Sequence, residues 1–295
     1  MARVGFIGLG VIGFPMAGHL VDCGHEMIVY NRSSEKISKF VNSFSCASAE
    51  TPAELARDTE VIFCCVGNDN DVLDVTIGDD GAFKTMGANA IFVDHTTASA
   101  SLARKLSNIA SSSGRKFIDA PVSGGEIGAQ NGTLTTMCGG DKDAYSRVET
   151  LISSYSKSCK LMGESGAGQL TKMVNQICIA GLLQGLSEGL SFAENANLQV
   201  NDVLEVIAGG AAGSWQMNNR GKTMAVNEFD FGFAVNWMRK DLKICLEEAN
   251  KNGSSLPITA LIDEFYKDVQ NMGGGRWDTS SLIARLRKLN EKTKK

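Results

Sequence analysis

The sequence predicts an α/β domain built on a mostly parallel sheet, followed by a domain that contains only helices. Short apolar runs alternate with helical stretches in the first half of the chain, as they do in βαβ proteins. These runs lack the in-and-out alternation of half-exposed strands, which is typical of strands buried on both faces. After Gly163 the strand-like runs stop, and helical periodicity continues to the end of the chain.

The strands and helices of the first domain follow each other in a regular order. The strand-like runs are RVGFIGL, EMIVYN, VIFCCVG, AIFVDHTT and KFIDAPV, followed by GTLTTMCGG and KSCKLMG. Helical stretches separate them, for example at residues 14–23 and 98–112. Since parallel strands need a long crossover connection, this order places helices on both faces of the sheet.

The second domain is predicted to begin with a long helix that leads out of the first. The helical stretches are Ala167–Asn195, Val200–Ala208, 231–252, Pro257–Asn271 and 280–289. Pro257 suits the first turn of a helix, where its missing N–H group is not needed. We therefore expect an N-terminal domain of residues 1–163 and a C-terminal domain of residues 164–295.

Composition and charge exclude several classes of protein. Of the 295 residues 43% are hydrophobic, which is enough for two cores, and the net charge of −4 gives no sign of a nucleic-acid partner. No apolar run is long enough to cross a bilayer, so we expect no membrane partner. The first residues enter a strand without a signal peptide, and the eight cysteines are scattered without a metal-binding spacing. We therefore expect a cytoplasmic protein with no metal site.

A glycine-rich loop follows the first predicted strand and opens the first helix. It consists of Gly8, Leu9, Gly10, Val11, Ile12 and Gly13. In this pattern the first glycine allows a tight turn, the second lets the backbone approach a diphosphate, and the third lets helix and strand pack closely. The N-terminus of the helix then presents N–H groups to the phosphates. The position inside a βαβ unit favours a dinucleotide site over a purely structural glycine turn.

The end of the second predicted strand indicates which dinucleotide binds. A cofactor with a free ribose 2′-hydroxyl usually meets an acidic residue here, whereas this chain has Asn31, Arg32 and Ser33. An arginine pairs with a 2′-phosphate through two N–H groups, and a serine hydroxyl adds a hydrogen bond. The sequence therefore favours NADP(H) over NAD(H). The alternative is that Arg32 stacks on the adenine, which either cofactor permits.

Four segments, taken in order, resemble one enzyme family. They are the glycine loop, DAPVSGGEIGAQNGTL at 119–134, GAGQLTKMVNQ at 166–176 and KDLKICLEEA at 240–249. Their order and spacing resemble the β-hydroxyacid dehydrogenases, a family that includes 3-hydroxyisobutyrate dehydrogenase and the glyoxylate and succinic semialdehyde reductases. The resemblance implies a Rossmann-type N-terminal domain, a long interdomain helix, an all-α C-terminal domain and a homodimer or homotetramer.

The resemblance gives a role to an unusual lysine. Lys172 is the only charged residue between Glu164 and Glu188, in a stretch typical of a buried helix. Burial and the positive end of a helix both disfavour an ammonium ion, so the pKa of such a lysine is expected to fall. Lys172 matches the catalytic lysine of the family, which exchanges a proton with the substrate. The alternative is a lysine whose stem crosses the core while its ammonium group reaches water.

The resemblance also implies a set of substrate-binding residues. Ser123, Gly124 and Gly125 follow a predicted strand and are expected to hold the substrate carboxylate or the reacting oxygen, since glycines let the backbone come close. Asn175 lies three residues after Lys172, on the same face of the predicted helix, and matches a substrate-binding asparagine. A packing hydrogen bond between helices would also explain this asparagine.

Further residues are expected to line the cofactor. By resemblance, Lys240 lies near both the cofactor and the substrate, and Thr97 lies beside the nicotinamide. Val66, Gly67 and Asn68 follow a predicted strand and are expected on the ribose and diphosphate side of the cofactor.

Three further aromatic residues lie in or near the predicted site segments and need an interpretation. His95 precedes Thr97 closely, and we interpret it as a packing residue. Trp215 and Phe231 either form a wall of the substrate pocket or pack in the core of the C-terminal domain.

Together these patterns predict an NADPH-dependent reductase of small aldehyde acids, with Lys172 as the general acid. The substrate is expected to carry a carboxylate, as glyoxylate and succinic semialdehyde do. One alternative is an NAD-linked dehydrogenase of the 3-hydroxyisobutyrate or L-serine type, which Arg32 argues against. Another is a non-catalytic scaffold that binds NADPH, which the presence of Lys172, Ser123 and Asn175 argues against.

Overall fold

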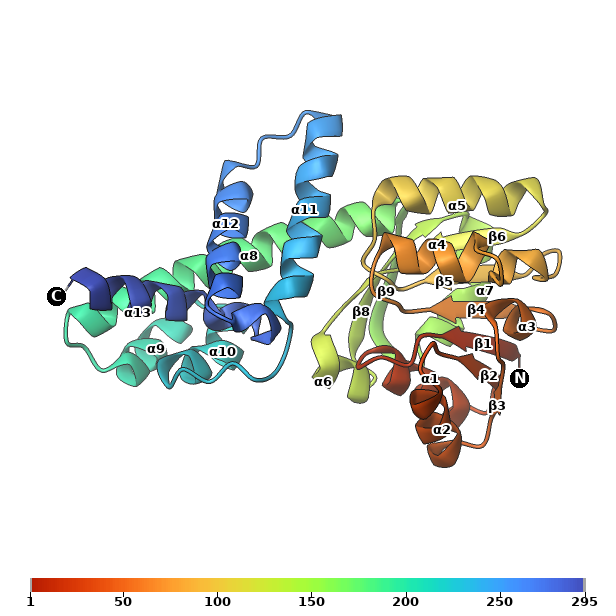
Figure 1. The fold of residues 1–295 in the computed structure, drawn as a ribbon, viewed down its shortest axis with the longest axis horizontal. Helices are drawn as coiled ribbons and strands as arrows, with labels where there is room; N and C mark the ends of the chain where they lie inside the picture. The colour runs from red at the N-terminus through yellow and green to blue at the C-terminus, as the bar shows by residue number, and fades with distance from the viewer. Residues whose placement is uncertain (1, 294–295) are drawn as a thin grey trace. The chain divides into compact units, whose positions relative to one another are not determined.

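The structure is a computed structural model that describes residues 2–293, and the chain divides into two compact units. The first unit is Met1–Lys172 and the second is Met173–Lys295. Figure 1 shows the elements of each unit, coloured from the N-terminus to the C-terminus. Over the described residues, no helix has the length and apolar character needed to cross a membrane.

The described part of the first unit is built on one sheet of nine strands. The strands are β1 (Arg3–Ile7), β2 (Glu26–Tyr30), β3 (Ala47–Ser48), β4 (Val61–Cys64), β5 (Ile91–Asp94), β6 (Lys116–Asp119), β7 (Val122–Ser123), β8 (Leu134–Gly140) and β9 (Ser156–Gly163). Their order is β3-β2-β1-β4-β5-β6-β8-β7, and β9 also pairs with β8. The strands from β1 to β6 pair in parallel, whereas β8 runs antiparallel to β6 and β7. This topology confirms the predicted α/β domain.

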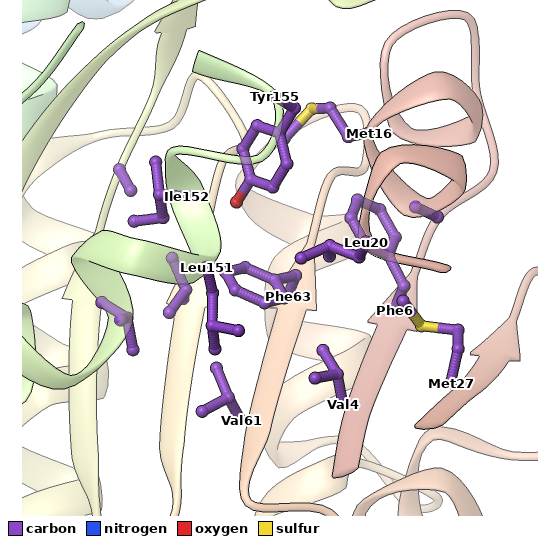
Figure 2. Packing of buried hydrophobic residues seen from close by; sticks show 14 of the residues in the cluster. Val4, Phe6, Met16, Leu20, Met27, Val61, Phe63, Leu151, Ile152 and Tyr155 are labelled. Carbon is purple, nitrogen blue, oxygen red and sulfur yellow. The ribbon is translucent and has the colours of Figure 1, made fainter. Parts of the chain in front are cut away.

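Helices cover both faces of this sheet. They are α1 (Gly13–Asp22), α2 (Ser34–Ser43), α3 (Pro52–Ala56), α4 (Asp69–Ile77), α5 (Ala100–Ser112), α6 (Gly125–Gln130), α7 (Lys142–Ile152) and the short 3₁₀ helix η1 (Ala82–Lys84). Along β4, Val61 and Phe63 enter one core cluster with α1 and α7, while Ile62 and Cys64 enter a second cluster with α3, α4 and α5. Figure 2 shows part of the first cluster, in which Phe63 lies among side chains of β1, α1 and α7. Each face of the strand is buried, which explains why its sequence shows no polar alternation.

The buried carboxylate of Asp119 fixes the start of the long helix α8 (Ala167–Asn195). Asp119 ends β6, and its side chain is fully buried. Its Oδ1 accepts a hydrogen bond from the Gly166 N–H group at 2.7 Å, and its Oδ2 accepts one from the Gln169 N–H group at 2.9 Å. The first turn of a helix leaves N–H groups without helical partners, and a carboxylate placed there also meets the positive end of the helix dipole.

Two glycines make room for this contact. A Cβ atom at Gly168 would collide with the carbonyl oxygen atoms of Met137 and Asp119, and one at Gly139 would lie 2.7 Å from Asp119 Oδ1. Neither position therefore accepts a side chain unless the backbone moves. The pKa of the Asp119 carboxyl is raised to about 6, because burial disfavours its charge more strongly than the N–H groups favour it.

The second unit consists of helices, as predicted. It contains the rest of α8, then α9 (Val200–Ala208), α10 (Trp215–Ala225), α11 (Val235–Asn252), α12 (Pro257–Asn271) and α13 (Leu282–Thr293), with the 3₁₀ helices η2 (Gly274–Arg276) and η3 (Thr279–Ser281). One core cluster joins α8 to α11 and α12 around Met238 and Tyr266. A second cluster joins α8 to α9, α10 and α13 around Leu190 and Met224.

The helix bounds of the second unit agree with the sequence prediction except in three places. The prediction contains no helix at α10, and it starts α11 at residue 231 instead of Val235. It also places the last helix at residues 280–289, whereas α13 is Leu282–Thr293. Phe233 donates its N–H group to Asp278 Oδ2 at 2.9 Å, and Ala234 forms an antiparallel bridge with Asp278. Gly232 has a φ of 70°, which helical backbone does not adopt. The segment before Val235 is therefore a loop held by a distant aspartate.

The close packing around Asp119 leads to a test of stability. We expect Gly168→Ala to lower the free energy of unfolding by about 1–3 kcal/mol, the usual penalty for overpacking a tight contact. Urea unfolding followed by circular dichroism measures this change. The control is Gly209→Ala, since Gly209 has a φ of −82° and open space around its Cβ position. We expect the control to keep or gain stability. Equal effects of the two substitutions would show that the Asp119 contact tolerates a methyl group.

Candidate active site

The carboxyl ends of five parallel strands lie side by side at one edge of the sheet in the first unit. The register pairs Ile7 with both Tyr30 and Cys64, Cys64 with Asp94, and Asp94 with Asp119. The segments that follow these strands therefore leave the sheet at the same edge. They contain the residues of the first unit that the sequence analysis selects, apart from the lysine of α8. Ligands of open α/β sheets bind at such an edge.

The glycine loop after β1 has the shape that a diphosphate needs. Gly8 has a φ of 99°, and a Cβ atom there would collide with the Cys65 carbonyl oxygen. A Cβ atom at Gly13 would collide with the Gly8 carbonyl oxygen. At Gly10 a Cβ atom would meet open space, and no side chain caps the N-terminus of α1. The loop therefore offers an open backbone and a helix N-terminus, which fit the diphosphate of a nicotinamide dinucleotide.

The segment after β2 supports the glycine loop and carries an exposed cation. Asn31 Oδ1 accepts a hydrogen bond from the Leu9 N–H group at 2.9 Å, and Asn31 Nδ2 donates to the Ser33 carbonyl at 3.2 Å. Asn31 thus ties the loop to the end of β2. The Arg32 side chain is 91% exposed, with its Nη1 atom 3.5 Å from Asp71 Oδ1. Since such an exposed ion pair contributes little to stability, the guanidinium group is able to turn toward a ligand.

The segments after β4 and β5 are bonded to each other. The Val66 N–H group donates to Thr96 Oγ1 at 3.0 Å. The side chain of Asn68 caps α4, because its Oδ1 accepts two backbone N–H groups from the first turn of that helix. Gly67 and Thr97 are partly exposed and lie in the same two segments. The structure thus gives Asn68 a structural task and leaves its backbone for any contact with a cofactor.

Two titratable side chains lie buried just behind this edge. His95 Nδ1 donates to the Ala120 carbonyl at 2.6 Å, which leaves Nε2 to accept from the Tyr155 hydroxyl at 2.9 Å. The ring also stacks on Phe63, and burial lowers the pKa of His95 to about 4. The packing role predicted for His95 is therefore confirmed. Burial also raises the pKa of the Asp94 carboxyl to about 7.

A glycine turn follows Ser123 at the same edge. Ser123 pairs with Thr135 across β7 and β8 and is partly exposed. Gly124 and Gly125 have φ values of 131° and 63°, which favour glycine. A Cβ atom at Gly125 would meet nothing within 4 Å. The backbone of the turn is thus open to a ligand beside the Ser123 hydroxyl.

The side chain of Gln169 attaches α8 to the segment after β5. Its Oε1 accepts from the Ala98 N–H group at 3.1 Å, and its Nε2 donates to the Thr96 carbonyl at 2.7 Å. These two bonds lie on either side of Thr97. Lys172 follows Gln169 by three residues, so it lies on the same face of α8, and it is 7% exposed. The buried lysine is therefore on the helix face that attaches to the Thr97 segment.

In the second unit, a buried polar network connects the two predicted substrate-binding residues. Asn175 Nδ2 donates to Gln176 Oε1 at 2.7 Å, and Gln176 Nε2 donates to Asp241 Oδ2 at 2.6 Å. The Lys240 ammonium lies 3.1 Å from Asp241 Oδ1. Gln176 and Asp241 are each 2% exposed. These contacts hold Asn175 and Lys240 in place together, with Asp241 Oδ1 in an ion pair with Lys240 and without a hydrogen bond.

The two aromatic residues of the second unit lie at its surface. Trp215 is 56% exposed and Phe231 is 36% exposed, so the core alternative is wrong for both. The Arg220 guanidinium lies 5.1 Å from the centroid of the Trp215 ring and 5.0 Å from that of Phe231. Arg220 also pairs with the buried Asp278 at 3.2 Å. Cation–π contacts thus fix both rings. A role of these rings in the substrate pocket stays a prediction.

The sequence analysis misses the residues that support this site. They are Asp119, Gln169, Gln176 and Asp241. All four lie inside the segments that carry the family resemblance, and all four are polar side chains with at most 2% exposure. The useful signal is a polar residue on the apolar face of a predicted helix or at the end of a buried strand, since such a group needs a partner.

Comparison with known families matches both halves of the chain. Residues 3–163 match the model for the NAD binding domain of 6-phosphogluconate dehydrogenase. Residues 166–286 match the model described as NAD-binding of NADP-dependent 3-hydroxyisobutyrate dehydrogenase. The chain belongs to the β-hydroxyacid dehydrogenase family, and it is an oxidoreductase that acts on CH–OH groups with a nicotinamide cofactor. This confirms the resemblance found in the sequence.

Individual relatives agree with this assignment. An uncharacterised oxidoreductase of Shewanella frigidimarina is 56% identical over 288 residues, which cover 98% of this chain and 99% of the relative. The 2-hydroxy-3-oxopropionate reductase of Escherichia coli is 33% identical over 284 residues, which cover 96% of this chain and 97% of the relative. The solved structure of Mycobacterium tuberculosis 3-hydroxyisobutyrate dehydrogenase with L-serine has a TM-score of 0.88 and 26% identity, covering 97% of this chain and 99% of that one.

Proposed function

We propose that the protein is an NADPH-dependent reductase of small aldehyde acids, in which Lys172 is the general acid. The observation that carries this proposal is the placement of a buried lysine on α8, one turn after the Gln169 contacts that bracket Thr97. A lysine with 7% exposure is an uncommon core residue, and a role in proton transfer explains its burial. The 2-hydroxy-3-oxopropionate reductase of E. coli, at 33% identity, supports this substrate class.

Each residue of the proposed site has a defined task. When bound, the nicotinamide supplies the hydride that reduces the aldehyde carbon. The Lys172 ammonium donates a proton to the oxygen atom as negative charge develops there, and the neutral amine takes it back in the reverse direction. The Ser123 hydroxyl and the open backbone of the glycine turn hold the substrate carboxylate. In the second unit, we propose that Asn175 and Lys240 also bind a substrate that carries a carboxylate.

The proposed preference for NADPH rests on the end of β2. Arg32 and Ser33 occupy the place where an acidic residue would bond a free ribose hydroxyl. Arg32 is exposed and has an ion pair with Asp71 that is weak in water, so a 2′-phosphate competes well for the guanidinium group. The alternative, an NAD-linked dehydrogenase of the 3-hydroxyisobutyrate type, would use the same glycine loop without a contact to Arg32.

We also propose that α8 pairs with a second copy of the chain. An exposed stripe runs along this helix and includes Val174, Leu182 and Phe192, which are 61%, 49% and 73% exposed. Between them lie Gly181, Gly185 and Gly189, where a Cβ atom would meet nothing within 4 Å. Small residues in such a stripe let another helix approach closely, and an apolar stripe of this length is rarely left in water.

The first prediction tests the proton donor. Lys172→Met keeps the apolar stem and removes the ammonium group, so we expect kcat to fall by roughly 10²–10⁴-fold, the usual range for a lost general acid. NADPH affinity should change little, because the glycine loop lies on other elements of the first unit. Stopped-flow or steady-state assays with glyoxylate and succinic semialdehyde measure kcat, and fluorescence titration measures NADPH binding.

The matched control for this prediction is Lys105→Met, which removes an exposed lysine from α5. The control should keep the turnover of the wild type. If Lys172→Met has a turnover within about threefold of the wild type and only a changed melting temperature, Lys172 is a structural lysine and the proposed mechanism fails.

The second prediction tests the cofactor preference. Arg32→Asp removes a cation and places a carboxylate where a 2′-phosphate would bind, so we expect the preference for NADPH over NADH to fall by on the order of tenfold or more. The ratio of kcat/KM for the two cofactors measures this preference. Arg57→Asp, an equal charge change at an exposed site, should leave the ratio unchanged. An equal ratio in wild type and Arg32→Asp would favour the NAD-linked alternative.

The third prediction tests the pairing of α8. Gly185→Leu adds a bulky side chain where the single chain has open space, so the isolated chain should fold at least as well, because leucine is the better helix former. A second helix on this stripe would clash, and we expect the dimer dissociation constant to rise by on the order of 10–100-fold. Sedimentation equilibrium measures this dissociation constant.

The control is Gly87→Leu, at another glycine with open space around its Cβ position, which should leave the dissociation constant unchanged. A wild-type monomer at micromolar concentration contradicts the pairing.

A further inference from the structure

A pair of cysteines lies on two neighbouring strands, β8 and β9, of the sheet in the first unit. Cys138 on β8 and Cys159 on β9 are both free, and their Sγ atoms are 3.6 Å apart. The parallel register pairs Cys159 with Thr136 and Cys138 with Leu161, so the two cysteines are diagonal neighbours. Two sulfur atoms in contact on adjacent strands need only small side-chain rotations and a modest strand shift to form a bond.

The two thiols differ in their access to solvent. Cys138 is fully buried in the core cluster that also contains Val148, whereas Cys159 is partly exposed on β9. Among the described strands β9 pairs only with β8, and its exposed residues include Lys157 and Lys160. The hydrogen bond from Cys138 lowers the pKa of the Cys159 thiol, which favours its thiolate form. Cys159 is therefore the thiol that an external reagent reaches first.

The backbone beside Cys138 touches the contact that starts α8. Gly139 follows Cys138, and a Cβ atom there would lie 2.7 Å from Asp119 Oδ1 and 2.7 Å from the Gly168 nitrogen. The register between β8 and β9 is irregular at this same place, between Cys138 and Gly139. A bond that draws β8 toward β9 would therefore move backbone that has no free space next to the Asp119 carboxylate.

We propose that Cys138 and Cys159 form a reversible disulfide in the presence of a low-molecular-weight disulfide, and that this bond loosens the first turn of α8. The Cys159 thiolate attacks one sulfur of the external disulfide, which forms a mixed disulfide and releases one thiol. Cys138 then attacks the Cys159 sulfur and gives its proton to the departing thiolate, which closes the internal bond and releases the second thiol. Two cysteine thiols are oxidised, and one external disulfide is reduced to two thiols.

The test treats the full chain with oxidised glutathione and maps its disulfides by mass spectrometry after alkylation and digestion. We expect a peptide containing Cys138 linked to one containing Cys159, and dithiothreitol should reverse the link. In Cys138→Ala, glutathione should stay bound to Cys159. In Cys159→Ala, glutathione should not modify Cys138, which is buried. If Cys138→Ala fails to fold by circular dichroism, Cys138→Ser replaces it.

Hydrogen exchange tests the second half of the proposal. In the oxidised wild type, we expect the amides of Gly166 and Gln169 to exchange on the order of tenfold faster than in the reduced protein. Oxidised Cys138→Ala should show no such change. The exposed Cys23 is an internal control for general thiol reactivity.

Two results overturn the proposal. If glutathione modifies Cys23 while Cys138 and Cys159 stay as free thiols, the pair does not exchange with an external disulfide. If the internal bond forms but the amides of Gly166 and Gln169 exchange at the same rate in the oxidised and the reduced protein, the bond does not loosen the contact between Asp119 and α8. Neither measurement depends on the substrate or on the direction of the enzyme reaction.

Discussion

One buried carboxylate determines where the long helix α8 begins. Asp119 accepts the N–H groups of Gly166 and Gln169, and these two bonds set both the position and the rotation of the first turn of α8. The rotation then places Gln169 against the segment around Thr97, with Lys172 one turn further on the same face. The proton transfer proposed for Lys172 needs a lysine that is held firmly, and this chain of contacts restrains the turn of α8 before it.

Each unit holds its predicted functional residues in a separate way. In the first unit, a sheet buried on both faces brings five strand ends to one edge, so short loops carry the residues on a rigid support. In the second unit no sheet edge exists among the described residues, and the support is a polar network. Gln176 and Asp241 connect Asn175 to Lys240 through side chains alone. Backbone register positions the first set, and hydrogen bonds position the second.

Local sequence patterns predict much of this molecule, and long-range contacts account for the rest. The glycine loop and the bounds of α9 and α12 follow from residues that are neighbours in the chain. The family motifs select Lys172 for the same reason. In contrast, the partners of Asp119 lie 47 and 50 residues away, and Asp241 lies 65 residues from its partner Gln176. The late start of α11 depends on Asp278, 45 residues after Phe233. A single sequence does not show such pairs, because nothing local marks them.

The buried acids at the sheet edge change how the fold responds to protons. Burial raises the pKa of Asp94 to about 7 and that of Asp119 to about 6, well above the values of about 4 expected in the unfolded chain. At pH values between about 4 and these folded-state pKa values, the folded chain binds protons that the unfolded chain releases. By linkage, the stability that these two groups contribute is fully present below about pH 4 and is lost as pH rises through 6 and 7. Acid unfolds many proteins because their paired carboxylates must be protonated. At this edge the sign is opposite, because the burial of Asp94 and Asp119 costs less free energy once their carboxyl groups take up protons.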